Sequence, residues 1–140
     1  MNPDRVIAEA RLWIGTPYVH GQASRGAGCD CLGLLRGVWR ALYGEEPEPC
    51  PPYAPDWAAA GRDTLHEAAD RWLAPAEEGP GAVALFRLGS GPVANHCAIL
   101  SGEGRLIHAT NARAIHPPRV LEAPMGVAMT RRAVGFWRFP

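Results

Sequence analysis

The sequence contains no lysine, and all fourteen of its basic residues are arginine. Fourteen acidic residues balance them, so the formal net charge at pH 7 is zero. Without an excess of positive charge, the chain has no field that would attract nucleic acid or an anionic membrane surface, and we expect neither as a partner. We attribute the arginine bias, like the abundant alanine, glycine and proline, to GC-rich coding rather than to function.

Long apolar segments are also missing. No apolar run approaches the roughly 20 residues that a membrane-spanning helix needs. Residues 1–13 carry acidic residues early and have no apolar core of about seven residues or more, unlike a secretory signal peptide. We therefore expect synthesis in the cytoplasm without a signal peptide. If the protein acts at the periplasm or cell wall, another component has to deliver it.

Cysteine is scarce, with four residues in the chain, too few for a disulfide framework at this size. Cys29 and Cys31 are so close in sequence that a disulfide between them would close a small, strained ring, so we expect thiols. A zinc site formed by Cys29, Cys31, His96 and His108 is a weaker alternative, because the usual paired C-x₂₋₄-C or H-x₃₋₅-H spacing is not present. We predict no metal and no other cofactor.

The remaining pattern predicts one α+β domain over residues 1–140. Apolar residues recur at helical spacing over residues 3–13, 30–43 and 57–73. Short β-prone segments follow at residues 81–88, 95–101, 105–110 and 133–139. Helices before strands favour N-terminal helices packed on a small antiparallel sheet.

Two segments have no periodicity and are predicted to be irregular. Residues 19–29 are rich in glycine and are predicted to form a loop. Residues 47–55 are rich in proline, and they are a candidate wall of a cleft or a docking element. A rigid surface connection is the interpretation that we prefer for the second segment.

Cys31 is the stronger candidate for a nucleophile. If Asp30 caps the helix over residues 30–43, Cys31 lies in its first turn, where unpaired N–H groups and the helix dipole lower a thiol pKa. Cys29 would then lie before the helix, in a glycine-bracketed loop. The alternative for either residue is a small, buried, inert thiol, which is the usual fate of a free cysteine.

A thiolate site also needs a base and a group that orients this base. His96 and His108 lie twelve residues apart, on two segments that flank Ser101–Gly104. A three-residue hairpin loop with glycine in the left-handed conformation would place both histidines on one sheet face, towards the Cys31 helix. Cys97 would point the other way, into the far core. For the other histidines, a partly buried imidazole without a catalytic role is the preferred interpretation; these are His20, His66 and His116.

The ordered motifs resemble the NlpC superfamily of bacterial cell-wall cysteine peptidases, which have a compact papain-like fold. The resemblance covers most of the chain and rests on GTPYVHGQ, DCLGLLR, GAVALF and HCAILSGEGRLIHA in this order. The runs WIGTPY and GCDCLGLLRGVW further resemble the branch found in phage tails and gene transfer agents.

This resemblance implies a role for each candidate residue. Cys31 would be the nucleophile, His96 the general base and His108 the residue that orients the imidazole. Tyr18 matches a tyrosine that meets the substrate or the oxyanion, and Asp30 matches an acid near the substrate's amine. The nucleophile would lie at the start of a helix, in agreement with the helix and strand arguments above.

Two positions depart from the family pattern. Leu32 stands where a serine often follows the nucleophile, which puts a strict need for a free amino terminus on the substrate in doubt. His20 replaces an aromatic residue in the pocket wall, and we do not expect it to be catalytic.

The implied function is cleavage of peptidoglycan stem peptides at the γ-D-glutamyl–diaminopimelate bond, by a peptidase carried in a phage-like tail or gene transfer agent. Tail or baseplate hub proteins would then be partners. Two alternatives remain: a non-catalytic structural component of a tail, and an enzyme that acts on a different amide or acylates a lipid.

Overall fold

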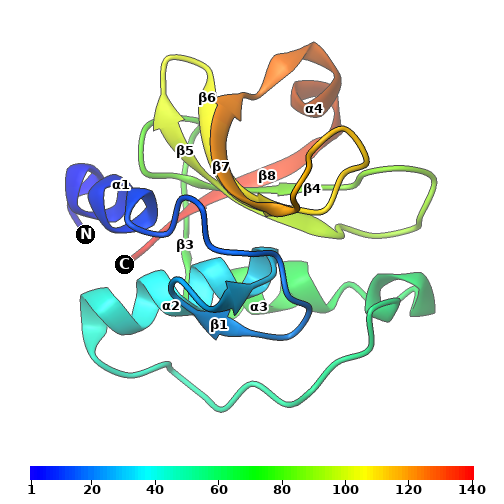
Figure 1. The fold of residues 1–140 in the computed structure, drawn as a ribbon, viewed down its shortest axis with the longest axis horizontal. Helices are drawn as coiled ribbons and strands as arrows, with labels where there is room; N and C mark the ends of the chain where they lie inside the picture. Colours follow the sequence, from blue (N-terminus) through cyan, green and yellow to red (C-terminus); the bar gives the residue numbers. More distant parts are fainter.

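The computed structural model describes residues 1–140, with the exception of the side chain at position 60. Its main sheet is antiparallel, with the strand order β3-β8-β4-β5-β6-β7. Helices lie against this sheet in the α+β arrangement expected from the sequence (Figure 1). The strands are β3 (Ala74–Pro75), β4 (Val83–Phe86), β5 (His96–Gly102), β6 (Arg105–Thr110), β7 (Arg119–Pro124) and β8 (Ala133–Arg138).

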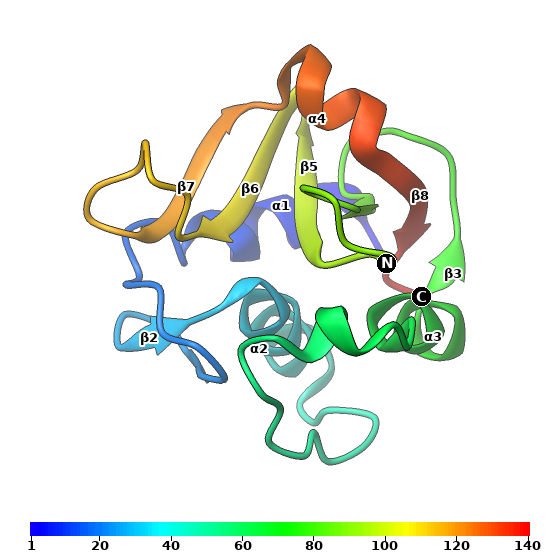
Figure 2. The same cartoon turned by 90° about the vertical axis from the view of Figure 1, so that its right-hand side faces the viewer.

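One face of the sheet carries the larger part of the core. Side chains from α1 (Pro3–Arg11), α2 (Cys31–Tyr43) and α3 (Thr64–Trp72) pack there against alternate residues of the central strands. The opposite face packs against α4 (Gly126–Arg132), which lies on the far side of the sheet from α2 and α3 (Figure 2). Among the described residues, none of the helices has the length and apolarity needed to cross a membrane.

The first two helices begin as their sequence signals predict, although α1 ends at Arg11 rather than at residue 13. Asn2 caps α1 by accepting the Asp4 N–H at 2.8 Å, and a proline occupies its first turn. At the C-terminal end of α2, Gly44 has φ 91°, a conformation that favours glycine and terminates the helix. The segment between these helices is not a plain loop, since it forms a small hairpin of β1 (Ala23–Ser24) and β2 (Gly28–Cys29).

The single helix predicted over residues 57–73 is wrong. The chain forms a short 3₁₀ helix, η1 (Trp57–Ala60), and then α3, with a break at Gly61, which has φ 82°. A left-handed glycine interrupts the hydrogen-bond ladder, so the two apolar patterns belong to separate elements.

The β5–β6 hairpin has the expected parity but a different turn. Glu103 and Gly104 both have positive φ, at 55° and 70°, as the central residues of a two-residue turn do. One additional residue forms a bulge between Leu100 and Gly102. A two-residue turn plus one bulged residue shifts the register by the same parity as the predicted three-residue loop. His96 and His108 therefore still lie on the same side of the hairpin.

Candidate active site

Cys31 is the first residue of α2, and Asp30 fixes the start of this helix. Asp30 has an extended backbone, and its carboxylate accepts the Gly33 N–H at 2.7 Å, which is the geometry of an N-cap. The backbone N–H of Cys31 therefore belongs to the first turn, where N–H groups have no intrahelical acceptor. The residue is 8% exposed, so its thiol is largely shielded from water.

The glycine in the D-C-x-G-L motif allows the chain before the helix to approach it closely. A Cβ atom on Gly33 would lie 1.8 Å from the backbone oxygen of Gln22. The Asp30 N–H also donates to this oxygen, at 3.3 Å. Any larger residue at position 33 would push the loop away from the first turn of α2. The motif thus encodes the packing that holds the nucleophile as well as the nucleophile itself.

The two histidines form a hydrogen-bonded pair. His96 Nε2 lies 2.7 Å from His108 Nδ1, and the rings meet edge to face with centroids 5.0 Å apart. Burial, and then the proximity of His96, lower the pKa of His108 to about 3, so its ring is neutral near pH 7. A neutral His108 that accepts the Nε2–H of His96 leaves Nδ1 of His96 as its basic nitrogen.

Cys97 lies beside Cys31, and the prediction that it points into the far core is wrong. Cys97 and Ile99 belong to the core cluster that contains Cys31, whereas Ala98 belongs to the cluster on the opposite face. Alternation along β5 therefore points Cys97 towards α2. His96 also reaches Cys31, because it is the first residue of β5 and is not held between neighbouring residues of its own strand.

The surroundings of Cys31 favour the thiolate. A hydrogen bond from the Cys97 side chain is the largest influence, and together with the adjacent His96 it lowers the pKa of the Cys31 thiol, against the effects of burial and of Asp30. The pKa of Cys97 is correspondingly raised, first by its hydrogen bond to Cys31 and then by burial. Cys31 thus carries the charge of this pair of thiols.

Cys29 is in a different state only two positions away. It lies in β2 rather than in a loop, is 0% exposed, and pairs with Ala23. Burial, followed by the charges of Asp30 and Cys31, raises its pKa to about 12. Cys29 is therefore a protonated core thiol near neutral pH.

Tyr18 lies next to these cysteines, as predicted for a residue at the substrate site. Its backbone forms a bridge with Cys29, and its side chain packs against the core cluster that includes Cys31. Burial, and then the negative charges of Cys31 and Asp30, raise the pKa of the Tyr18 hydroxyl. This hydroxyl keeps its proton and can donate a hydrogen bond. Its contact with substrate remains a prediction.

Asp30 is enclosed by protein donors. It is 3% exposed, and its Oδ2 accepts the Gly21 N–H at 2.8 Å and a hydrogen bond from the Tyr53 hydroxyl. His20 Nδ1 lies 3.8 Å from the same oxygen. Contact between Asp30 and a substrate amine stays a prediction, but its contacts within the protein are those of a helix cap.

Sequence reasoning missed Tyr53. It belongs to the proline-rich segment that we preferred to interpret as a surface connection, yet it reaches the start of α2. Its backbone oxygen also lies 2.7 Å from His20 Nε2. Tyr53 is half-buried in the structure, whereas the residues on either side of it are exposed. The sequence of this segment has no periodicity from which that burial could be predicted.

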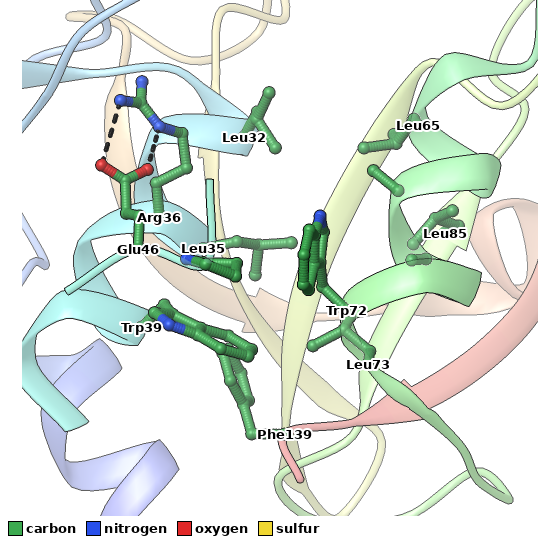
Figure 3. A pocket seen from close by; sticks show the side chains of 13 residues that line it. Leu32, Leu35, Arg36, Trp39, Glu46, Leu65, Trp72, Leu73, Leu85 and Phe139 are labelled. Carbon is green, nitrogen blue, oxygen red and sulfur yellow. Dashed lines mark hydrogen bonds and ion pairs between the residues drawn. The ribbon is translucent and has the colours of Figure 1, made fainter. Parts of the chain in front are cut away.

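An apolar pocket of about 100 Å³ lies between α2 and α3 (Figure 3). Leu32, the residue after Cys31, is part of its wall, and Trp39 and Trp72 face each other across it. The ion pair of Arg36 and Glu46 lies at one end. Where the family pattern has a polar serine, this site therefore has an apolar wall.

The described residues contain no group of three or more histidine, cysteine or acidic side chains arranged to hold a metal ion.

The chain is similar in sequence to the gamma-DL-glutamyl hydrolase of Bacillus subtilis (strain 168), with 30% identity over 115 residues. The match covers 79% of this chain and 24% of the relative, so the chain spans about a quarter of that protein's length. No protein-family model matches the chain.

Solved structures show the same fold. The NlpC/p60 domain of the peptidoglycan hydrolase SagA superposes with a TM-score of 0.61 at 23% identity, covering 100% of both chains. An NlpC/P60 family protein from Bacillus cereus gives a TM-score of 0.68 at 19% identity, covering 99% of this chain and 40% of the other. RipB, a peptidoglycan hydrolase of Mycobacterium tuberculosis, gives 0.58 at 22%, covering 97% and 63%. The chain therefore has the α+β NlpC/P60 papain-like fold.

Proposed function

We propose that this chain is a cysteine peptidase of the NlpC/P60 kind that hydrolyses peptidoglycan stem peptides. The observation that carries the proposal is the arrangement of Cys31, His96 and His108, in which a thiol at a helix N-terminus adjoins an imidazole whose far nitrogen is hydrogen-bonded. A nucleophile, a base and a group that orients the base are the parts that thioester chemistry requires. Similarity to a gamma-DL-glutamyl hydrolase supports a γ-glutamyl amide as substrate.

In the first half of the reaction, the Cys31 thiolate attacks the carbonyl carbon of the scissile amide. The Cys31 N–H, in the first turn of α2, is directed to stabilise the oxyanion, and the Tyr18 hydroxyl is available as a second donor. The imidazolium of His96 then gives its Nδ1 proton to the leaving amine as the C–N bond breaks. A thioester on Cys31 and a free amine result.

In the second half, His96 Nδ1 removes a proton from a water molecule that attacks the thioester. The carboxylic acid leaves, and Cys31 regains its thiolate. The neutral His108 holds Nε2–H of His96 throughout, which fixes the tautomer and the plane of the ring. Since His108 stays unprotonated near neutral pH, it does not compete with His96 for the proton.

The bond proposed for cleavage joins γ-D-glutamate to diaminopimelate. Incubation of the protein with purified sacculi, followed by mass analysis of the released fragments, tests this assignment. Fragments that end in D-glutamate and others that begin with diaminopimelate are the expected products. Release of intact stem peptides, or of glycan fragments alone, would contradict it.

The finer proposal is that a phage-like tail or gene transfer agent carries the chain to the cell wall. Its support is the likeness of WIGTPY and GCDCLGLLRGVW to the branch found in such particles. Particles purified from a producing culture would be digested and examined by mass spectrometry for peptides of this chain, together with tail or baseplate hub proteins. Recovery of the chain only from the particle-free fraction would refute the proposal.

A further inference from the structure

Residues 45–56 form the proline-rich connection between α2 and η1, and we call this segment the strap. Ion pairs attach it to α2 and to α3. Near its start, Glu46 pairs with Arg36 of α2 at 2.5 Å. Two residues later, Glu48 pairs with Arg71 of α3 at 3.0 Å. The ion pairs and the prolines restrict the strap, so that a side chain further along it is presented with little loss of conformational entropy.

Tyr53 is the side chain that the strap presents to the site. Its ring meets His20 edge to face, with centroids 5.0 Å apart, and lies 6.4 Å from the ring of Trp57. Its hydroxyl donates to Oδ2 of Asp30. Burial, and then the hydrogen bond to Asp30, raise the pKa of this hydroxyl, so it remains a donor across the pH range of a hydrolase.

Asp30 has two opposing effects on Cys31. As the N-cap, it sets the helix start and thereby the position of the sulfur. As an adjacent negative charge, it raises the pKa of the Cys31 thiol. A hydroxyl that donates to Asp30 Oδ2 spreads this charge and reduces its repulsion of the thiolate while leaving the cap in place.

We propose that Tyr53 is a positioning residue of the active site, which acts through Asp30 to keep the Cys31 sulfur ionised. The proposal concerns the state of the nucleophile and does not depend on which substrate the enzyme takes. The other titratable groups that face this sulfur come from the preceding loop, β2 and β5; they are Tyr18, Cys29, His96 and Cys97.

The test is Tyr53→Phe, which removes one oxygen and keeps the ring on His20. Each protein is treated with iodoacetamide at a series of pH values, and labelling of Cys31 is followed by peptide mapping. We expect the midpoint of labelling to rise by about half a pH unit, which lowers the rate below the midpoint about threefold. The matched control is Tyr43→Phe. Tyr43 is the last residue of α2, at the opposite end from Cys31, and its hydroxyl donates to the Pro140 oxygen.

The variant Asp30→Asn tests whether Tyr53 acts on Cys31 through the charge of Asp30. Asparagine caps helices about as well as aspartate but carries no charge. We expect this variant alone to lower the labelling midpoint, and Tyr53→Phe to cause no further shift when combined with it. An unchanged midpoint in Tyr53→Phe, an equal shift in Tyr43→Phe, or an equal effect of Tyr53→Phe with and without the Asp30 charge would each overturn the proposal. Because labelling needs no peptidoglycan, the outcome is separate from that of the sacculus experiment.

Discussion

Cys31 lies between two regions of different construction. On the sheet side, alternation points Cys97 towards α2, and His96 reaches the thiol from the start of β5. His108, on the adjacent strand β6, is hydrogen-bonded to His96. The loop side consists of the N-cap at Asp30 and the strap with Tyr53, which meet through side-chain hydrogen bonds.

The two regions have different roles in the proposed reaction. The sheet side supplies proton transfer, because a hydrogen-bonded ladder holds two imidazoles in a fixed relation. The loop side sets the position of the nucleophile and opposes its charge, because Asp30 both caps α2 and repels the thiolate. Damage to the histidine pair should therefore affect turnover, whereas damage at Asp30 or Tyr53 should affect the position and the ionisation of Cys31.

The largest effect is expected at the point where the regions meet. Cys31→Ala removes the nucleophile and should reduce muropeptide cleavage to background, a loss of about 10⁴-fold or more. Cys29→Ala removes a protonated thiol that is 0% exposed and should leave most of the cleavage. Equal losses in the two variants, measured as fragment release from sacculi, would show that the cysteines are not different in kind.

The next effect breaks the loop side. In Gly33→Ala, the new methyl group would meet the Gln22 oxygen at 1.8 Å, so the loop must move from the helix start. We expect a loss of about 1–3 kcal/mol in unfolding free energy and a larger fractional loss of cleavage. Gly91→Ala is the control, because nothing lies within 4 Å of its added Cβ. Similar denaturation midpoints for both variants would contradict the packing role of Gly33.

On the sheet side, His108→Ala removes the acceptor for His96 Nε2–H. The imidazole can then rotate or change tautomer, and we expect kcat to fall about 100-fold or more with little change in KM. His108→Gln offers an amide oxygen in place of Nδ1 and should recover part of the activity. If steady-state kinetics gave the same loss for both variants, hydrogen bonding to His96 would not be what His108 contributes.

A further effect on the sheet side is a pH dependence of stability. The pKa of His108 is about 3 in the folded protein against 6.5 for the free side chain. As the pH falls below the higher value, the unfolded chain takes up a proton that the folded chain does not, so stability decreases by about 1.4 kcal/mol per pH unit.

Urea denaturation at several pH values between 7 and 4 measures this slope. His108→Gln should flatten it, because glutamine does not titrate. The carboxylates that also lose native pairing in acid, such as Glu46, are the same in both proteins and do not affect the difference. Parallel curves for the wild type and the variant would contradict a buried, neutral His108.

Much of the sheet side could be predicted from the sequence, because strand alternation is a strict rule. The prediction that His96 and His108 lie on the same side of the hairpin was correct, although the predicted turn was wrong. The bulge after Leu100 replaced the third loop residue and kept the same parity. Cys97 was misplaced because the same rule was applied with His96 as the reference. His96 begins β5, where the direction of a side chain is least restricted.

The loop side could be predicted only in part. The cap and nucleophile have a local signature, because Asp30 bonds within its own helix turn. Tyr53 has no local signature, because its partner Asp30 lies 23 residues away. The proline-rich segment also has no periodicity from which the direction of the Tyr53 side chain could be predicted. Edge strand β7 has a single fully buried residue and α4 has none, so neither carried an apolar pattern to detect.

The central claim is that Cys31 is the thiolate of this site, and pH-resolved alkylation of the wild-type protein tests it most directly. The folded protein is exposed briefly to iodoacetamide between pH 5 and pH 9, and each cysteine is quantified by peptide mapping. Cys31 should be labelled first, with a midpoint well below that of an ordinary thiol, while Cys29 and Cys97 remain unlabelled throughout. Labelling of Cys31 that begins only near pH 9, or that is matched by Cys29, would contradict the account.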